Sequence, residues 1–232
     1  IDGMVIEGEL SFNVDTKSGK EETVAFANNL QRNLEEIIEH CKNIIENNKT
    51  QHTSSDFETV NISQQLLDKI QKDNQIEHIY PGNSLQQGFI YHTLRQPEDV
   101  AYRVQFLFDY KQELNIENYI KSWELAIQKY PILRTSFNWE EEIIQIVCSN
   151  AKLKYQFLDI SDLSETEKEK YIINLQQEDR NIAFDLTKPC LLRLYILKQT
   201  KALYTIIESE HHSIADGWSA PVLLNTIHKN YY

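Results

Sequence analysis

The segment at 202–231 limits the possible folds of this chain more than any other part of the sequence. It opens with the run ALYTII at 202–207, whose apolar, β-branched and aromatic residues predict a mostly buried strand. Two histidines follow, His211 and His212, and then an Asp-Gly pair that predicts a turn with unusual backbone dihedrals. Apolar residues then recur at helical spacing, with Pro221 near the helix start. The segment therefore predicts a strand, a tight turn and a helix, with the histidines at the junction.

A junction that holds two histidines and an aspartate is a suitable place for proton transfer, because imidazole titrates near neutral pH. Two adjacent histidines at a strand end, taken alone, more often have no chemical role. A metal site made of His211, His212 and Asp216 has a possible spacing, but no further convincing ligand run accompanies it. The wider sequence has to decide between these readings.

Charge and cysteine content exclude several classes of partner. The net charge of −12 argues against nucleic acid or an anionic membrane as the main partner, since both are polyanions. No apolar run approaches the ~20 residues that a membrane span needs, and no signal peptide is recognisable. Cys41, Cys148 and Cys190 are far apart and lack metal-ligand spacing, which indicates reduced thiols in a cytoplasmic protein.

Upstream of the histidines, strand and helix patterns alternate along the chain. Ser164 with Glu167 forms a candidate capping box, and Ser84 is a candidate N-cap. The predicted strands cover 102–110, 132–137, 143–147, 153–158 and 191–197, and the predicted helices lie at 63–73, 84–94, 115–130 and within 161–185. This alternation predicts an α/β fold, a two-layer sandwich.

The first part of the chain differs in composition from the rest. Residues 1–46 predict a strand or hairpin arm and a long amphipathic helix, which together make a poor independent core. Residues 47–60 are polar and have linker composition. We therefore divide the chain into an appendage at 1–46, a linker at 47–60 and a main domain at 61–232.

Four stretches in the main domain resemble one known family. HHSIADG at 211–217 matches the HHxxxDG motif of the condensation-domain superfamily, whose fold resembles chloramphenicol acetyltransferase. The stretch at 80–92 resembles the family's opening motif, with Asn83 in place of the usual second proline. ILRTSF at 132–137 matches the L-R-T-x-F motif, although the three residues before it depart from the usual R-H-E or R-H-P. FDL…P…LLR at 184–193 resembles a further family segment.

The resemblance implies a function and roles for particular residues. It implies that the main domain is the N-terminal lobe of a condensation domain, an acyltransferase that forms peptide bonds in nonribosomal peptide synthesis. His212 would act at the acceptor amine, either taking its proton or positioning it, while His211 and Asp216 would be scaffolding. Arg134 would pair with Asp216. Backbone N–H groups near Gly217 could face the oxyanion that forms when the amine attacks the thioester carbonyl.

Residues 1–46 resemble the last strand and helix of an epimerisation domain. The L-Q-x-G form of the opening motif is typical of condensation domains that follow such a domain and accept a D-configured donor. The alternative is a strand–helix appendage that belongs to the main domain itself.

The resemblance also implies partners. Peptidyl carrier domains on both sides would deliver substrates on phosphopantetheine arms, next to adjacent domains of the same synthetase, and the chain itself would bind no cofactor. Both ends look cut from a longer protein, and the second lobe of the family fold is absent, so we expect this chain alone to be inactive. Two other readings stay open: a non-catalytic docking lobe and a stand-alone thioester-dependent acyltransferase.

Overall fold

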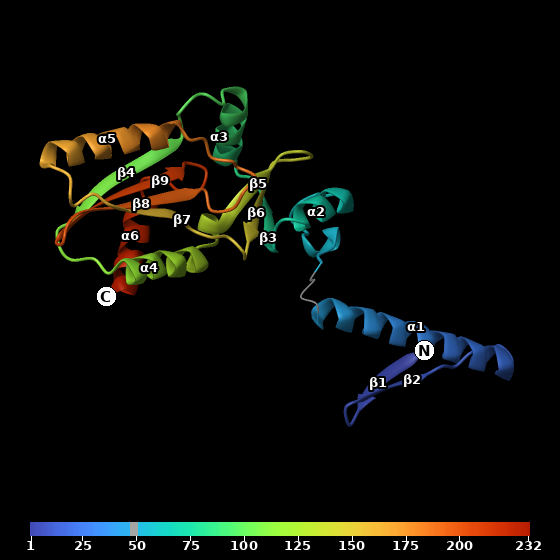
Figure 1. Cartoon of the computed structure of the whole chain (residues 1–232). Helices are drawn as coiled ribbons and strands as arrows, with labels where there is room; N and C mark the ends of the chain where they lie inside the picture. The colour runs from blue at the N-terminus through green and yellow to red at the C-terminus, as the bar shows by residue number, and fades with distance from the viewer. Residues whose placement is uncertain (47–50) are drawn as a thin grey trace. The chain divides into compact units, whose positions relative to one another are not determined.

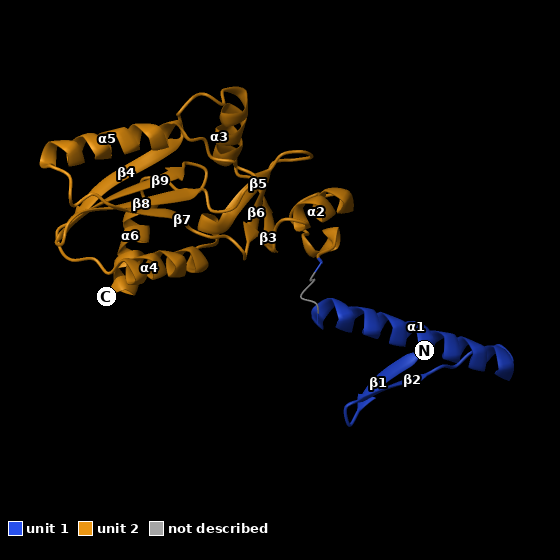
Figure 2. Cartoon of the chain, viewed as in Figure 1, with its two compact units in different colours: residues 1–51 blue, residues 52–232 orange. Residues whose placement is uncertain are grey.

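The computed structural model describes residues 1–46 and 51–232 (Figure 1). It divides into two compact units, an N-terminal unit of residues 1–51 and a main unit of residues 52–232 (Figure 2). None of the helices in the described ranges is both long enough and apolar enough to cross a membrane.

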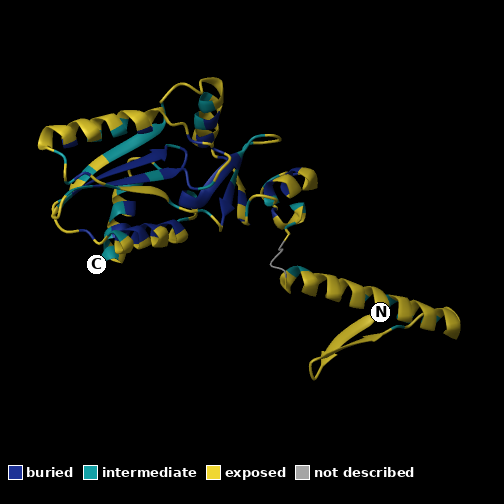
Figure 3. Ribbon diagram, in the orientation of Figure 1, coloured by how far each residue is buried: buried dark blue, intermediate teal, exposed yellow. Residues whose placement is uncertain are grey.

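The N-terminal unit is a β-hairpin followed by one long helix. Strands β1 (Asp2–Ile6) and β2 (Glu9–Asn13) pair antiparallel, and the turn between them uses left-handed backbone at Glu7 and Gly8, with φ of 50° and 87°. Helix α1 (Lys20–Glu46) is the long helix that the amphipathic pattern predicted. No described residue of 1–46 is buried (Figure 3). The prediction that this part makes a poor independent core is therefore confirmed.

The main unit begins earlier than the composition indicated. The 3₁₀ turn η1 (Ser54–Asp56) is followed by Phe57, which is buried in a cluster with helix α2 (Gln64–Gln71). Residues 52–60 therefore belong to the packed main unit, and the predicted linker at 47–60 is too long. Its first four residues, 47–50, lie outside the described residues.

A three-stranded antiparallel sheet packs against α2. Its strands stand in the order β3 (Ile76–Pro81), β6 (Ile144–Cys148) and β5 (Thr135–Asn138). The predicted strand at 132–137 begins with a 3₁₀ turn, η2 (Pro131–Arg134), and becomes extended only at Thr135. Apolar side chains of β3, β6 and α2 form the small core on this side of the unit.

A four-stranded sheet carries the predicted histidine strand at an interior position. Its order is β4 (Arg103–Tyr110), β9 (Leu203–His211), β8 (Leu192–Thr200) and β7 (Lys154–Asp159). Only the β7–β8 pair is parallel. Strand β9 lies between β4 and β8 and is almost wholly buried, as the apolar run predicted, and it continues to His211.

Helices cover both faces of this sheet (Figure 1). Helices α4 (Ile116–Lys129) and α6 (Ser219–Tyr231) pack on one face, against side chains such as Leu194 of β8. Helix α5 (Glu165–Asn181) packs on the other face, against side chains such as Leu197. The period-2 alternation of β8 supplies apolar groups to both faces. The predicted α/β class is confirmed, and α5 adds a third layer to the two predicted.

Local caps decide where two of the helices begin. Ser164 and Glu167 form the predicted capping box at the start of α5. Helix α3 (Ser84–Arg95) is capped by Asn83, not by Ser84: the Asn83 side chain accepts from the backbone N–H of Gln86, and the Gln86 side chain accepts from that of Asn83. Asn83 can do this because its short side-chain carbonyl reaches the free N–H groups of the first turn.

Candidate active site

His211 ends β9 as a buried, fully hydrogen-bonded side chain. Its Nδ1 accepts from the backbone N–H of Ser213 at 3.2 Å and lies 2.8 Å from the Ser213 hydroxyl. The hydroxyl of Thr93 donates to the carbonyl of Phe89 at 2.9 Å, so it can only accept from Nε2 of His211, 3.3 Å away. His211 is therefore the neutral Nε2–H tautomer.

The surroundings of His211 disfavour its charged form. Burial first, and then electrostatic repulsion from His212 and Arg103, lower the pKa of His211 to about 4. Both ring nitrogens are already hydrogen-bonded, and the lowered pKa keeps the ring neutral at neutral pH. The role of His211 as scaffolding stays a prediction.

His212 is held differently, with one ring nitrogen left over. Its backbone N–H donates to the carbonyl of Tyr102 at 2.8 Å, and its Nδ1–H donates to the carbonyl of Ala215 at 2.6 Å. A carbonyl oxygen only accepts, so the proton is on Nδ1 and the lone pair is on Nε2. Within the described residues, Nε2 has no hydrogen-bond partner. His212 thus presents a fixed, unengaged proton acceptor.

One face of α3 holds both histidines. Gln86, Phe89 and Thr93 follow one another at spacings of three and four residues, which places them on one side of the helix. Gln86 donates to the carbonyl of Ser213 at 3.2 Å, Phe89 stacks on the His212 ring at 5.1 Å and 11°, and Thr93 bonds His211. Sequence reasoning matched Gln86 to a motif and placed Phe89 only on the buried side of the helix. It did not single out Thr93, although the helical spacing of the three residues was a usable signal.

His92, on the same helix, takes no part in holding the pair. Its Nε2 lies 3.4 Å from a carboxylate oxygen of Asp99, and its ring meets the edge of the Tyr102 ring at 5.0 Å.

Tyr102 lies beside His212 and lines a surface depression. Its φ of 67° lies in the left-handed region, an uncommon and strained conformation for a tyrosine, and its carbonyl accepts from the His212 N–H. Tyr102 and Phe89 both line an open depression of about 560 Å³, together with Ser84, Leu85 and other residues of α3. The aromatic neighbours of His212 therefore form a wall of a surface hollow.

Asp216 and Gly217 form the turn between the histidines and α6. Oδ1 of Asp216 accepts from the hydroxyl of Ser219 at 2.7 Å and its backbone N–H at 2.9 Å, and from the N–H of Trp218 at 3.1 Å. These bonds cap α6, and the Ser219 hydroxyl, with its backbone N–H, lowers the pKa of Asp216. Gly217 is exposed and has no positive φ, so the predicted unusual dihedral at this pair is wrong. Its role at an oxyanion stays a prediction.

Arg134 has a different partner from the one predicted. It lies buried in η2 and forms a bidentate pair with Glu77 of β3, with Nη2 at 3.2 Å from Oε1. The predicted pairing with Asp216 is wrong, because the Asp216 carboxylate is engaged by the N-terminus of α6. Arg134 therefore ties η2 to the three-stranded sheet.

The described residues contain no group of three or more His, Cys, Asp or Glu side chains placed to hold a metal ion. His211, His212 and Asp216 have other hydrogen-bond partners and do not converge.

Sequence comparisons identify relatives of the whole arrangement. The sequence model of the family described as "Condensation domain" matches residues 76–232. A component chain of the mycosubtilin synthase of Bacillus subtilis is 31% identical over 241 residues, which cover 100% of this chain and 9% of the relative. N-(5-amino-5-carboxypentanoyl)-L-cysteinyl-D-valine synthase of Amycolatopsis lactamdurans is 41% identical over 153 residues, which cover 65% of this chain and 4% of the relative. The chain spans less than a tenth of the length of either relative.

Solved structures lead to the same family. A holo four-domain nonribosomal peptide synthetase bound to AMP and glycine aligns with a TM-score of 0.60 and 26% identity, over 68% of this chain and 12% of that one. The starter condensation domain of rhizomide synthetase aligns with a TM-score of 0.59 and 14% identity, a likeness of fold alone, over 65% of this chain and 38% of that one. With the family match over 76–232, these findings show that the chain belongs to the condensation-domain family of nonribosomal peptide synthetases.

Proposed function

We propose that this chain is the histidine-bearing lobe of a condensation domain that forms peptide bonds. Its donor is a carrier-bound peptidyl thioester, and its acceptor is the amine of a carrier-bound aminoacyl thioester. The observation that carries the proposal is His212: a hydrogen bond to the Ala215 carbonyl fixes its tautomer, and its Nε2 is left without a partner among the described residues.

Atoms and electrons balance in the proposed reaction as follows. The amine nitrogen attacks the thioester carbonyl carbon, the C–N bond forms and the carbonyl π electrons move to oxygen. Collapse of this tetrahedral species breaks the C–S bond and releases the thiolate of the donor's phosphopantetheine arm. The amine gives up one proton, which ends on that thiolate. Nε2 of His212 either carries this proton or positions the amine by accepting its hydrogen bond.

Further parts of the proposal concern the oxyanion, the donor and the partners. Backbone N–H groups near the exposed Gly217 would face the oxyanion. The donor would be D-configured, delivered after an epimerisation domain whose tail is residues 1–46. The mycosubtilin relative aligns with the whole chain and not only with the main unit, which supports residues 1–46 as part of a synthetase. Carrier domains on both sides and the adjacent synthetase domains would be the partners.

The proposal also places the protein in the cytoplasm. Cys41, Cys148 and Cys190 are free thiols, which suits a reducing compartment.

The test is peptide formation by the synthetase that carries this chain, with donor and acceptor loaded on their carriers. We expect His212→Ala to lower the single-turnover rate by about 10²- to 10⁴-fold with loading intact. His92→Ala is the matched control, because His92 lies on α3 near the same wall but pairs with Asp99, and it should leave the rate within about twofold. An unchanged rate for His212→Ala would overturn the proposal and favour a docking lobe.

A second arm uses the 232-residue chain alone. The chain covers 38% of the solved starter condensation domain, so the rest of that fold would supply the second lobe. We expect no dipeptide from loaded carriers mixed with this chain, and detectable product would contradict this part of the proposal.

A further inference from the structure

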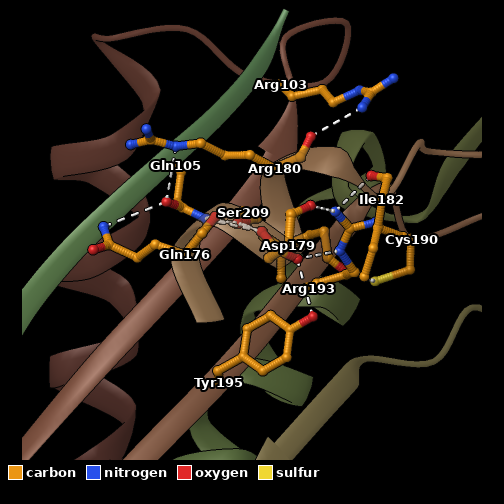
Figure 4. A network of polar contacts seen from close by, with 11 residues as sticks. Arg103, Gln105, Gln176, Asp179, Arg180, Ile182, Cys190, Arg193, Tyr195 and Ser209 are labelled. Atoms are coloured by element: carbon orange, nitrogen blue, oxygen red, sulfur yellow. Dashed lines mark hydrogen bonds and ion pairs between the residues drawn. The ribbon is translucent and has the colours of Figure 1, made fainter. Parts of the chain in front are cut away.

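Asp179, near the end of α5, is the centre of a buried polar network (Figure 4). Its side chain is 2% exposed. Oδ1 accepts from Nε of Arg193 at 2.9 Å and from the hydroxyl of Tyr195 at 3.0 Å. Oδ2 accepts from Nε2 of Gln105 at 2.9 Å and from the hydroxyl of Ser209. Four donors therefore converge on one carboxyl group, which fills its acceptor capacity.

The four donors come from three adjacent strands. Gln105 lies on β4, Ser209 on β9, and Arg193 and Tyr195 on β8. Burial and the neighbouring Asp179 raise the pKa of Tyr195 to about 12, so its hydroxyl remains a donor. Taking a carboxylate and a guanidinium out of water is costly, and apolar residues of similar size often serve stability as well or better. A network of this kind is therefore better explained by the geometry that it fixes than by stability alone.

One route leads from Asp179 to His211 through Arg193. The guanidinium of Arg193 also donates to the backbone carbonyls of Asp179 at 3.1 Å and Ile182 at 3.0 Å, and its central carbon lies 4.0 Å above the ring of Phe184. The Phe184 ring in turn meets His211 edge to face, with centroids 6.2 Å apart. Asp179 thus orients the arginine that packs on Phe184, a ring neighbour of His211.

A second route runs along β9. Ser209 precedes His211 by two residues, so their side chains leave the strand on the same face. The Ser209 hydroxyl donates to Asp179 and lies 3.3 Å from Nε2 of Gln105. The strand is therefore tied to α5 and β4 at the last same-face position before His211.

We propose that Asp179 is a positioning residue for the histidine pair, because both routes from its carboxylate end at His211. His211, through its bonds with Ser213, sets the turn in which Nδ1 of His212 meets the Ala215 carbonyl. The proposal rests on the proposed function, in which the lone pair of His212 works at the acceptor amine. Asp179 itself touches no substrate.

The variant that tests this is Asp179→Asn in the loaded synthetase. The amide has the same size, but its NH₂ group cannot accept from Ser209 or Gln105, so we expect the single-turnover rate to fall by about 10- to 100-fold. The KM for the acceptor carrier should change by less than about twofold, because the buried Asp179 side chain is not part of the surface that a carrier can contact. The matched control is Leu175→Ala, also on α5, which loosens the same helix through the apolar cluster under it and leaves the Asp179 network alone.

A readout without activity separates positioning from simple loss of stability. In the 232-residue chain, ¹⁵N-labelled imidazole signals should show defined tautomers for both histidines in the wild type and in Leu175→Ala. In Asp179→Asn we expect mixed or exchange-broadened signals for His211 and His212. Unperturbed signals, with a rate no lower than that of Leu175→Ala, would overturn the proposal.

Two further variants keep the outcome interpretable. Ser209→Ala removes one contact of Asp179 without leaving Arg193 unpaired, and it should shift the same imidazole signals to a smaller extent. This variant replaces Asp179→Asn in the test if Asp179→Asn does not fold. His212→Ala in the same assay tests the proposed function: if it keeps full activity, that function fails, while the imidazole signals still decide the role of Asp179.

Discussion

Nδ1–H of His212 donates to the carbonyl oxygen of Ala215, three residues further along the chain, at 2.6 Å. The adjacent His211 uses its Nδ1 in the opposite sense, accepting from the backbone N–H of Ser213 at 3.2 Å. Two neighbouring histidines are therefore held in opposite tautomers by a single tight turn. Only the second of them presents a lone pair without a protein partner in the described part of the chain.

The first prediction concerns these tautomers. Long-range ¹H–¹⁵N spectra at about pH 7 should show His211 protonated on Nε2 and His212 protonated on Nδ1. The physical reason is that a carbonyl oxygen can only accept, while the Ser213 N–H can only donate. His92 and His228 provide reference signals in the same spectrum. Identical tautomers at His211 and His212 would contradict the geometry.

The second prediction concerns acid stability. Burial lowers the pKa of His211 to about 4, below its value of 6.5 when exposed, so the unfolded chain binds the proton more readily. The contribution of the neutral His211 to the free energy of unfolding is therefore fully present above pH 6.5. It is lost as pH drops toward 4, by at most about 3 kcal/mol. Denaturant unfolding followed by the fluorescence of the buried Trp123 measures it. His211→Gln should be less stable at pH 7 but show a shallower loss toward pH 4, and an unchanged slope would refute the assignment.

The third prediction concerns Glu210, whose effect on stability has the opposite pH dependence to that of His211. Burial, and then the charge of Asp216, raise the pKa of Glu210 to about 7, and the pKa of Glu208 beside it is raised by burial and by Glu210. The folded state thus holds the Glu210 proton more tightly than the unfolded chain, whose pKa is 4.5 at this residue. The contribution is present below pH 4.5 and is lost as pH rises through 7, by at most about 3 kcal/mol.

Glu210→Gln should accordingly gain stability relative to the wild type at about pH 8 and differ little at about pH 4.5. The exposed Glu169, changed to Gln, is the control and should show no such pH dependence. Equal stabilities of Glu210→Gln and the wild type at pH 8 would show that Glu210 does not titrate as stated.

The fourth prediction distinguishes the two partners considered for Arg134. A double-mutant cycle of Arg134→Met with Glu77→Gln should give a coupling energy of about 1 kcal/mol or more, because the two side chains form a bidentate pair. The cycle of Arg134→Met with Asp216→Asn should give less than about 0.5 kcal/mol. The reverse order of the two couplings would restore the pairing that the family resemblance implied.

Sequence patterns were sufficient for several elements whose cause is local. The buried run before His211 predicted β9, the helical spacing after Pro221 predicted α6, and Ser164 with Glu167 predicted the start of α5. In each case the signal is a periodicity or a cap within one segment, which neighbouring residues determine by themselves. The family motif at 211–217 likewise singled out the histidine turn.

Contacts between distant segments were decided only by the tertiary structure. Thr93 bonds His211 from 118 residues earlier in the chain, and Arg134 pairs with Glu77 although a carboxylate of the motif had been expected. Asp179, which no motif marked, became the centre of a network across three strands. Such pairings depend on how sheets and helices pack. The pattern of hydrophobicity and charge along the sequence does not indicate which of several polar side chains will face one another. The sequence by itself determined most of the elements and the position of the histidine turn. The packing of those elements determined which side chains hold His212 in place.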